Sequence, residues 1–146
     1  MPIASFKPAI LTLVVGLAIA ATAAQADQQD RPALSLDLNA LEQVGPACRL
    51  VFVATNNTGL PISEMSLETV LFNRAGTVER FALFDFQALP QGKTRVRQFD
   101  LPESRCGDIG RVLINGVASC KGEALKGNEC MDRLELKSSS KTEIVG

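Results

Sequence analysis

The chain has 146 residues, of which 46% are hydrophobic, 21% are charged and 5% are aromatic. This composition is typical of one globular domain and excludes a disordered chain or a polytopic membrane protein. The 15 Lys and Arg residues nearly balance the 16 Asp and Glu residues, so no large basic field is available to bind nucleic acid. The chain has no histidine, the most common general base and metal ligand, and we expect no cofactor and no metal.

Residues 1–26 have the organisation of a secretory signal peptide. Lys7 and the amino terminus supply a positive region, residues 9–20 are apolar, and residues 24–26 (Ala-Gln-Ala) form a small-x-small cleavage site. The apolar stretch is shorter than the roughly 18–20 residues that span a bilayer. We therefore expect cleavage, no membrane insertion of the mature chain, and a periplasmic or secreted protein.

The four cysteines, Cys48, Cys106, Cys120 and Cys130, all follow this cleavage site. An even number of cysteines in an exported chain indicates two structural disulfides. Three pairings are possible, and we favour Cys48–Cys106 and Cys120–Cys130 because the polar segment 121–129 is a short loop that a local bridge would close. A zinc site or a redox pair is disfavoured, since the sequence has no C-x-x-C spacing and no histidine to complete a ligand set.

Short runs of alternating apolar residues follow one another along the rest of the chain. Leu34, Leu36 and Leu38 alternate with polar residues, which is typical of a half-buried strand. Further strands are expected over residues 48–55, 65–72, 77–86, 94–99, 111–120 and 131–136. Gly116 is the expected position of a bulge or bend within one of these strands.

About seven short strands in one chain predict an all-β fold, either a sandwich or a barrel. Our first choice is an immunoglobulin-like β-sandwich with two disulfides. We expect the domain to span residues 27–136 and a flexible tail to follow over residues 137–146. One segment is ambiguous, because the apolar residues of 62–72 also fit the spacing of a helix.

Four runs of sequence carry a resemblance to known proteins: residues 47–56, 71–76, 92–102 and 106–115. Together they resemble a family of small exported proteins from proteobacteria that is labelled "Tat pathway signal sequence domain protein". More loosely, they resemble the FxLYD-type immunoglobulin-like domains of bacterial envelope proteins. The resemblance implies a periplasmic β-sandwich and no particular activity. The leader departs from the family label because it has no twin arginine, and the chain departs from the FxLYD pattern because it has no tyrosine.

A basic strand is the first candidate binding site. Lys93, Arg95 and Arg97 stand at every second position, so their side chains are expected to project from one face of a strand. Such a face can receive an acidic partner or a phosphate-bearing ligand. The alternative is a solvated strand whose charges discourage edge-to-edge pairing with another sheet.

A loop is the second candidate, and it consists of Asn56, Asn57, Thr58, Gly59 and Leu60. It resembles the loop by which chagasin-like inhibitors enter cysteine proteases, but the other two loops of that family are absent. The same residues are those of a plain turn. Residues 56–58 also match the short N-x-[ST] motif for glycosylation.

Aromatic and acidic residues give weaker signals. On a period of two, Phe84 and Phe86 share one face of a strand while Phe81 takes the other. Core packing is the default for these residues, and the candidates for an exposed partner surface are Phe81, or Val70 and Phe72. The remaining carboxylates form no enzyme motif and are scattered over strand ends and loops (Asp85, Asp100, Glu103 and Asp108).

The sequence therefore predicts no enzymatic activity. We expect an exported, monomeric binding or accessory module for an envelope protein or polymer, without a nucleic-acid partner. The alternative is a protease inhibitor that presents residues 56–60, and a hydrolase is the last choice.

Overall fold

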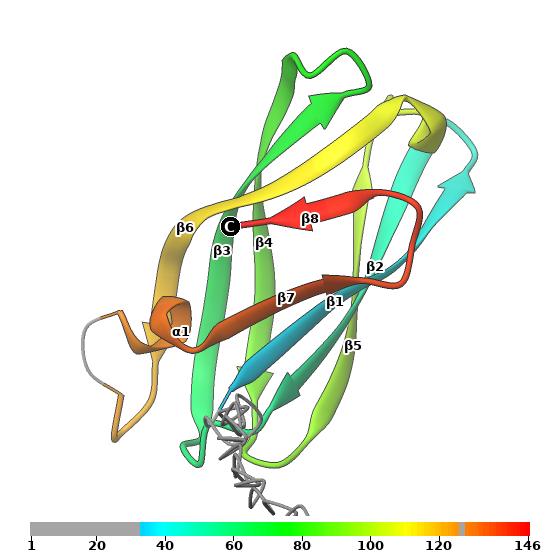
Figure 1. Cartoon of the computed structure of the whole chain (residues 1–146). Helices are drawn as coiled ribbons and strands as arrows, with labels where there is room; N and C mark the ends of the chain where they lie inside the picture. The colour runs from blue at the N-terminus through cyan, green and yellow to red at the C-terminus, as the bar shows by residue number, and fades with distance from the viewer. Residues whose placement is uncertain (1–32, 126–127) are drawn as a thin grey trace, which may run out of the picture.

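The computed structural model describes residues 33–125 and 128–146, so the expected signal peptide over residues 1–26 lies outside the described residues (Figure 1). The described part is dominated by strands, with one α-helical turn and one 3-10 turn. In chain order the elements are β1 (Leu34–Val44), β2 (Ala47–Asn56), β3 (Ile62–Asn73), β4 (Val78–Leu89), β5 (Thr94–Leu101), η1 (Cys106–Asp108), β6 (Ile109–Lys121), α1 (Glu129–Asp132), β7 (Leu134–Ser138) and β8 (Glu143–Val145).

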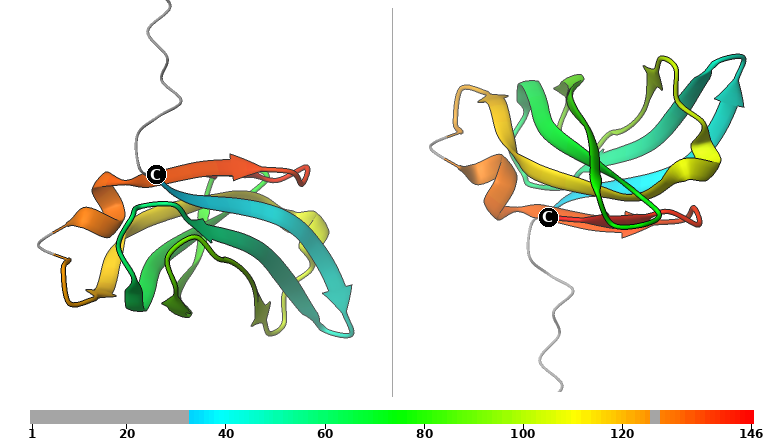
Figure 2. Two further views of the ribbon diagram at one scale, coloured as in Figure 1. Left: turned by 90° about the horizontal axis from the view of Figure 1, so that it is seen from below. Right: turned by 90° about the horizontal axis from the view of Figure 1, so that it is seen from above.

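These strands form two four-stranded sheets, with the orders β5-β2-β1-β7 and β4-β3-β6-β8. Neighbouring strands are antiparallel except in the pairs β1–β7 and β6–β8, which are parallel. Seen along the strands, the sheets pack face to face, with β7 and β8 on one side and β4 and β5 away from them (Figure 2). The predicted all-β, immunoglobulin-like sandwich is confirmed, with eight strands in place of about seven.

The period-two apolar pattern of the strands becomes the layer between the sheets. Leu34, Leu36 and Leu38 are fully buried, as their alternation predicts. Phenylalanine rings from both sheets meet in the same layer, with centroids between 4.4 and 5.9 Å apart (Phe52, Phe84, Phe86 and Phe99). Since large rings remove the most apolar area from water, this cluster is a main source of hydrophobic stabilisation.

The ambiguous segment 62–72 lies in a strand, β3, and not in a helix. It pairs with β4 on one side and with β6 on the other, so sheet hydrogen bonds satisfy its backbone and outweigh a weak helical spacing. β6 continues through the expected irregularity. Its register with β3 passes from Gly116 to Ile114 and skips Asn115, which confirms a bulge beside Gly116.

Both favoured disulfides are present. Cys48–Cys106 joins β2 to η1, and Cys120–Cys130 joins β6 to α1. Two structural disulfides indicate an oxidising, exported environment. Among the described residues, no helix has the length and apolar character needed to cross a membrane.

The prediction of a flexible tail over residues 137–146 is wrong. β7 runs to Ser138 and pairs with β1, and β8 pairs with β6. Hydrogen bonds hold the turn between them: the Asp37 carboxylate accepts from the backbone N–H and the hydroxyl of Ser139 at 2.9 and 2.8 Å, and the Ser138 hydroxyl donates to the carbonyl of Thr142 at 2.7 Å. The serine-rich composition that suggested a frayed tail instead supplies the hydroxyls of a turn.

Candidate functional site

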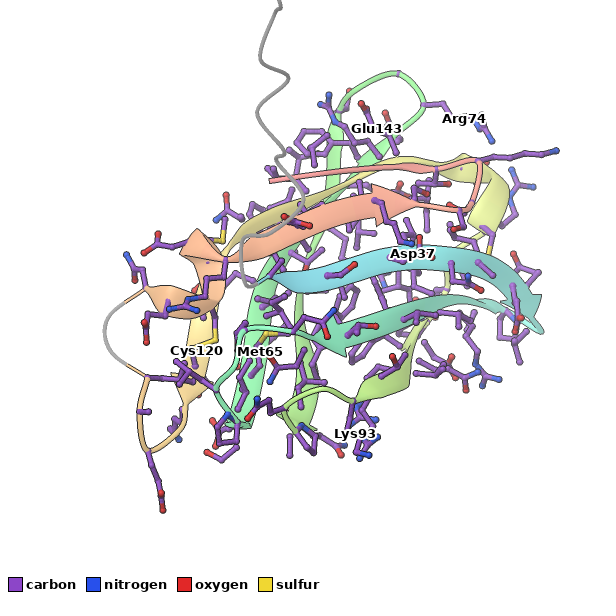
Figure 3. All side chains as sticks on the ribbon, turned by 60° about the horizontal axis from the view of Figure 1, so that its bottom comes forward. Asp37, Met65, Arg74, Lys93, Cys120 and Glu143 are labelled. Carbon is purple, nitrogen blue, oxygen red and sulfur yellow. A yellow bond between two sulfur atoms is a disulfide. The ribbon has the colours of Figure 1, made fainter. Side chains whose placement is uncertain are left out.

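Two long edge strands lie side by side at one border of the sandwich. β4 is the edge of one sheet and β5 is the edge of the other, and the turn through Lys93 connects them. Figure 3 shows Lys93 at this end of the molecule, far from Arg74 and Glu143. Because β4 and β5 belong to different sheets, each leaves one edge without a strand partner among the described residues.

The structure places the three predicted basic residues at this open border. Lys93 lies in the turn before β5, whereas Arg95 and Arg97 lie within the strand and are half-buried. Arg97 reaches across to β4, where its Nε donates to the carbonyl of Phe86 at 2.7 Å and its Nη2 to that of Ala88 at 3.2 Å. Arg97 therefore connects the two sheets and does not stand free on one face.

The arginines also cover part of the β5 edge itself. Asn56 donates its backbone N–H to the carbonyl of Lys93, so Lys93 faces β2. In an antiparallel pair, successive residues of a strand point their backbone groups alternately toward and away from the partner strand. The backbone N–H and C=O groups of Thr94 and of every second residue after it therefore face away from β2. Arg95 donates to the outward carbonyl of Thr94 at 3.0 Å, and Arg97 donates to that of Val96 at 3.2 Å. This arrangement favours the alternative that these charges protect the edge from pairing.

Beyond Arg97 a groove of about 420 Å³ lies between the two edges, lined by residues 80–84 of β4, by residues 98–101 of β5 and by Pro102 directly after it. Phe84 and Phe99, which line the groove, stack with centroids 4.4 Å apart, and Phe84 is buried. At the far end Arg80 donates to the carbonyl of Pro102 at 2.9 Å. The groove thus lies between two arginine bridges, Arg97 and Arg80, and has an aromatic wall.

The outer face of β4 beside this groove is apolar and exposed. The exposed fractions are 74% for Phe81 and 62% for Leu83, and both residues also line a smaller hollow of about 290 Å³ on the outer face of the sheet. Phe84 and Phe86 are buried, so the prediction that Phe81 takes the opposite face is confirmed, whereas Val70 is buried and Phe72 is half-buried. Neighbouring apolar side chains that are exposed together and rimmed by polar residues are a feature of interaction sites.

Carboxylates surround these two apolar side chains. Asp85 continues the period of two of Phe81 and Leu83, Glu79 precedes Phe81 by two residues at a register shift between β4 and β3, and Glu68 of β3 is the cross-strand neighbour of Leu83. All three are exposed, and none forms an ion pair within the part of the chain that the structure describes. We call Glu68, Glu79, Phe81, Leu83 and Asp85 the β4 patch.

The predicted loop at 56–60 is built as an internal turn. Asn56 is fully buried, its Nδ2 donates to the carbonyls of Leu60 and Leu89 at 2.8 and 2.7 Å, and its Oδ1 accepts from the Thr58 hydroxyl at 2.7 Å. Thr58 is 4% exposed, which leaves Asn57 and Gly59 exposed and Leu60 half-buried. These hydrogen bonds stabilise the turn. The side-chain amide of Asn56 is buried and is therefore not accessible for glycosylation.

Two other carboxylates have structural partners. Bidentate hydrogen bonds from Arg49, the shorter at 2.7 Å, lower the pKa of Asp100 and raise the pKa of the arginine. A hydrogen bond from the Ser119 hydroxyl and a second from Lys121 lower the pKa of Glu64. Across residues 33–125 and 128–146, no three acidic or cysteine side chains converge into a metal site.

Sequence reasoning named Phe81 but missed Leu83, the acidic residues around it and the groove. The signal was present in the sequence of β4, in which an acid stands two residues before Phe81 and another stands two residues after Leu83. The groove has no such signal, because it exists only where the edges of two sheets come together.

Comparisons with known proteins bear on the fold. No protein-family model matches the chain, and no curated protein matches it by sequence. The structure is similar to the solved structure of IrmA from Escherichia coli, with a TM-score of 0.59, 9% sequence identity and coverage of 71% of this chain and 90% of that chain. At this identity the similarity supports an all-β sandwich and carries no activity.

Proposed function

We propose that this chain is a periplasmic binding module that docks an envelope protein through the β4 patch and the adjoining groove. The observation that carries the proposal is the exposure of Phe81 and Leu83, 74% and 62%, on an edge strand whose second edge has no strand partner among the described residues. Natural sheets protect long apolar edges unless another surface covers them. The two disulfides support an oxidising compartment such as the periplasm.

The chemistry of the β4 patch is that of recognition. Phe81 and Leu83 offer apolar area that leaves water on contact, and an aromatic anchor near the centre of an interface typically provides much of the binding energy. The carboxylates around them provide orientation and charge selection more than affinity. These are the properties of a docking surface with an apolar centre and a polar rim.

Site-specific photo-cross-linking in the intact envelope tests this proposal. Benzoylphenylalanine replaces Phe81 in one variant and Val96 in the control variant, since Val96 is a comparably exposed apolar residue (55%) on β5. We expect a discrete adduct from position 81 that is lost when Leu83→Ser is added, and no such adduct from position 96. The absence of an adduct at position 81, or identical adducts at both positions, contradicts the proposal.

A further inference from the structure

Resting on this proposed function, we infer that the occupant of the β4 patch is an extended segment of the partner that adds to β4 as a strand. This segment carries two apolar side chains flanked by basic ones on its outward face.

The free edge of β4 provides the backbone for this addition. β4 has 12 residues and, among the strands that the structure describes, pairs only with β3. Arg97 occupies the carbonyls of Phe86 and Ala88, which leaves the earlier part of the strand, up to Asp85, as the accessible length. An added strand gains main-chain hydrogen bonds along such an edge, whatever its sequence.

Side chains of the added strand fall on two surfaces. Directly opposed residues of neighbouring strands share a face, so alternate side chains of the partner contact the β4 patch. The intervening side chains point to the inner side, where Ala82 and Phe84 line the groove of about 420 Å³. The groove therefore admits apolar side chains of modest size from the partner segment, which adds buried apolar area to the contact.

Charge determines which partner fits. Glu68, Glu79 and Asp85 are exposed and without ion pairs among the described residues, so a complementary segment presents Lys or Arg beside its apolar residues. A second copy of this chain fits poorly. Antiparallel pairing of two β4 strands about Ala82 would bring Glu79 of each copy close to Asp85 of the other, and like charges across neighbouring strands destabilise a sheet.

A library of random twelve-residue peptides displayed on phage, selected on the folded and disulfide-bonded chain, tests the inference. We expect enrichment of sequences with basic, apolar, apolar and basic residues at every second position. A synthetic peptide of the enriched sequence, followed by fluorescence anisotropy, should bind about tenfold more weakly to the Glu79→Gln/Asp85→Asn variant. Glu143→Gln on the edge strand β8 is the matched control and should change nothing.

Two further variants separate strand addition from simple side-chain contact. Methylation of alternate backbone nitrogens of the peptide should abolish binding if the segment pairs with β4, and Phe81→Ser should abolish it in either case.

Peptides that require Phe81 but carry no basic residues would overturn the occupant inferred here and leave the proposed function standing. Enrichment that is indifferent to Phe81→Ser, or no enrichment at all, overturns the inference, and the cross-linking experiment then decides the function independently. A concentration-dependent dimer that Phe81→Ser abolishes would identify a second copy as the occupant and overturn it as well.

Discussion

The two borders of this sandwich differ in the length of their edge strands and in how those edges are protected. At one border the edge strands are short, with five residues in β7 and three in β8, and a hydrogen-bonded turn between them packs against Asp37. At the other border the edge strands are long, with 12 residues in β4 and eight in β5. A short edge exposes few unpaired backbone groups, whereas a long one needs protection. Arg95 and Arg97 protect one half of the long border, and the other half is left apolar and exposed.

The largest expected effects concern the two disulfides, of which only Cys120–Cys130 lies next to the border with β7, through α1. Replacing Cys48 and Cys106 by Ala opens a loop of 58 residues, and replacing Cys120 and Cys130 opens one of ten. Loop-closure entropy predicts losses of about 4 and about 3 kcal/mol in the free energy of unfolding. Urea denaturation of both double variants measures the difference. A greater loss of unfolding free energy from the Cys120 and Cys130 variant would show that this disulfide stabilises the fold by holding α1 and β7 in place, beyond its effect on loop closure.

A matched pair of truncations compares the borders directly. Ile144 of β8 is 8% exposed and packs into the core, whereas Phe81 of β4 is 74% exposed. We expect Ile144→Ala to cost about 3 kcal/mol, because it leaves a cavity, and Phe81→Ala to cost no more than about 0.5 kcal/mol. Urea unfolding measures both. A substantial loss from Phe81→Ala would mean that this ring stabilises the fold and is not reserved for a partner.

The role of the edge arginines is tested by Arg97→Met, with Arg95→Met as its control. Methionine keeps an apolar stem but removes the guanidinium, which in Arg97 bonds to two carbonyls of β4 and in Arg95 to a carbonyl of its own strand. We expect Arg97→Met to cost about 1 kcal/mol and to increase self-association, because β4 carbonyls lose their donor. Equal effects from the two variants would contradict a bridging role for Arg97.

The smallest expected effect is a loss of stability in acid. The pKa values of Glu64 and Asp100 lie below their ordinary values of 4.5 and 3.8, so their ionised forms favour the folded state. This contribution is complete above those ordinary values and is lost as the pH falls through the lowered ones. Because both groups are exposed, the effect is slight and weakens further in high salt. Unfolding midpoints measured from pH 6 to pH 2 should fall less steeply for Glu64→Gln/Asp100→Asn than for the parent chain.

The parts of the fold that depend on local pattern were predictable from the sequence. Alternation identified Leu34, Leu36 and Leu38 as core residues, and a short polar loop identified the pairing of Cys120 with Cys130. β8 was missed because three residues are too few to show an alternation, and its serine-rich approach has the same composition as a frayed tail.

The candidate site was only partly predictable because it depends on long-range pairing. The alternation of β4 places Phe81 outward, but no local pattern reveals that β4 and β5 are edges of different sheets. The same limit applies to Arg95 and Arg97. Their spacing indicates a charged strand, while their function in covering carbonyls follows from the position of that strand at the border.

The central claim is that the free edge of β4 receives a partner strand. Amide hydrogen exchange of the full disulfide-bonded chain, with and without the peptide selected on it, tests this claim most directly because strand pairing protects backbone N–H groups. We expect slower exchange in β4 before Phe86, with β7 and β8 unchanged. Unchanged exchange in β4 at saturating peptide, or slowing confined to β7 and β8, would contradict the claim.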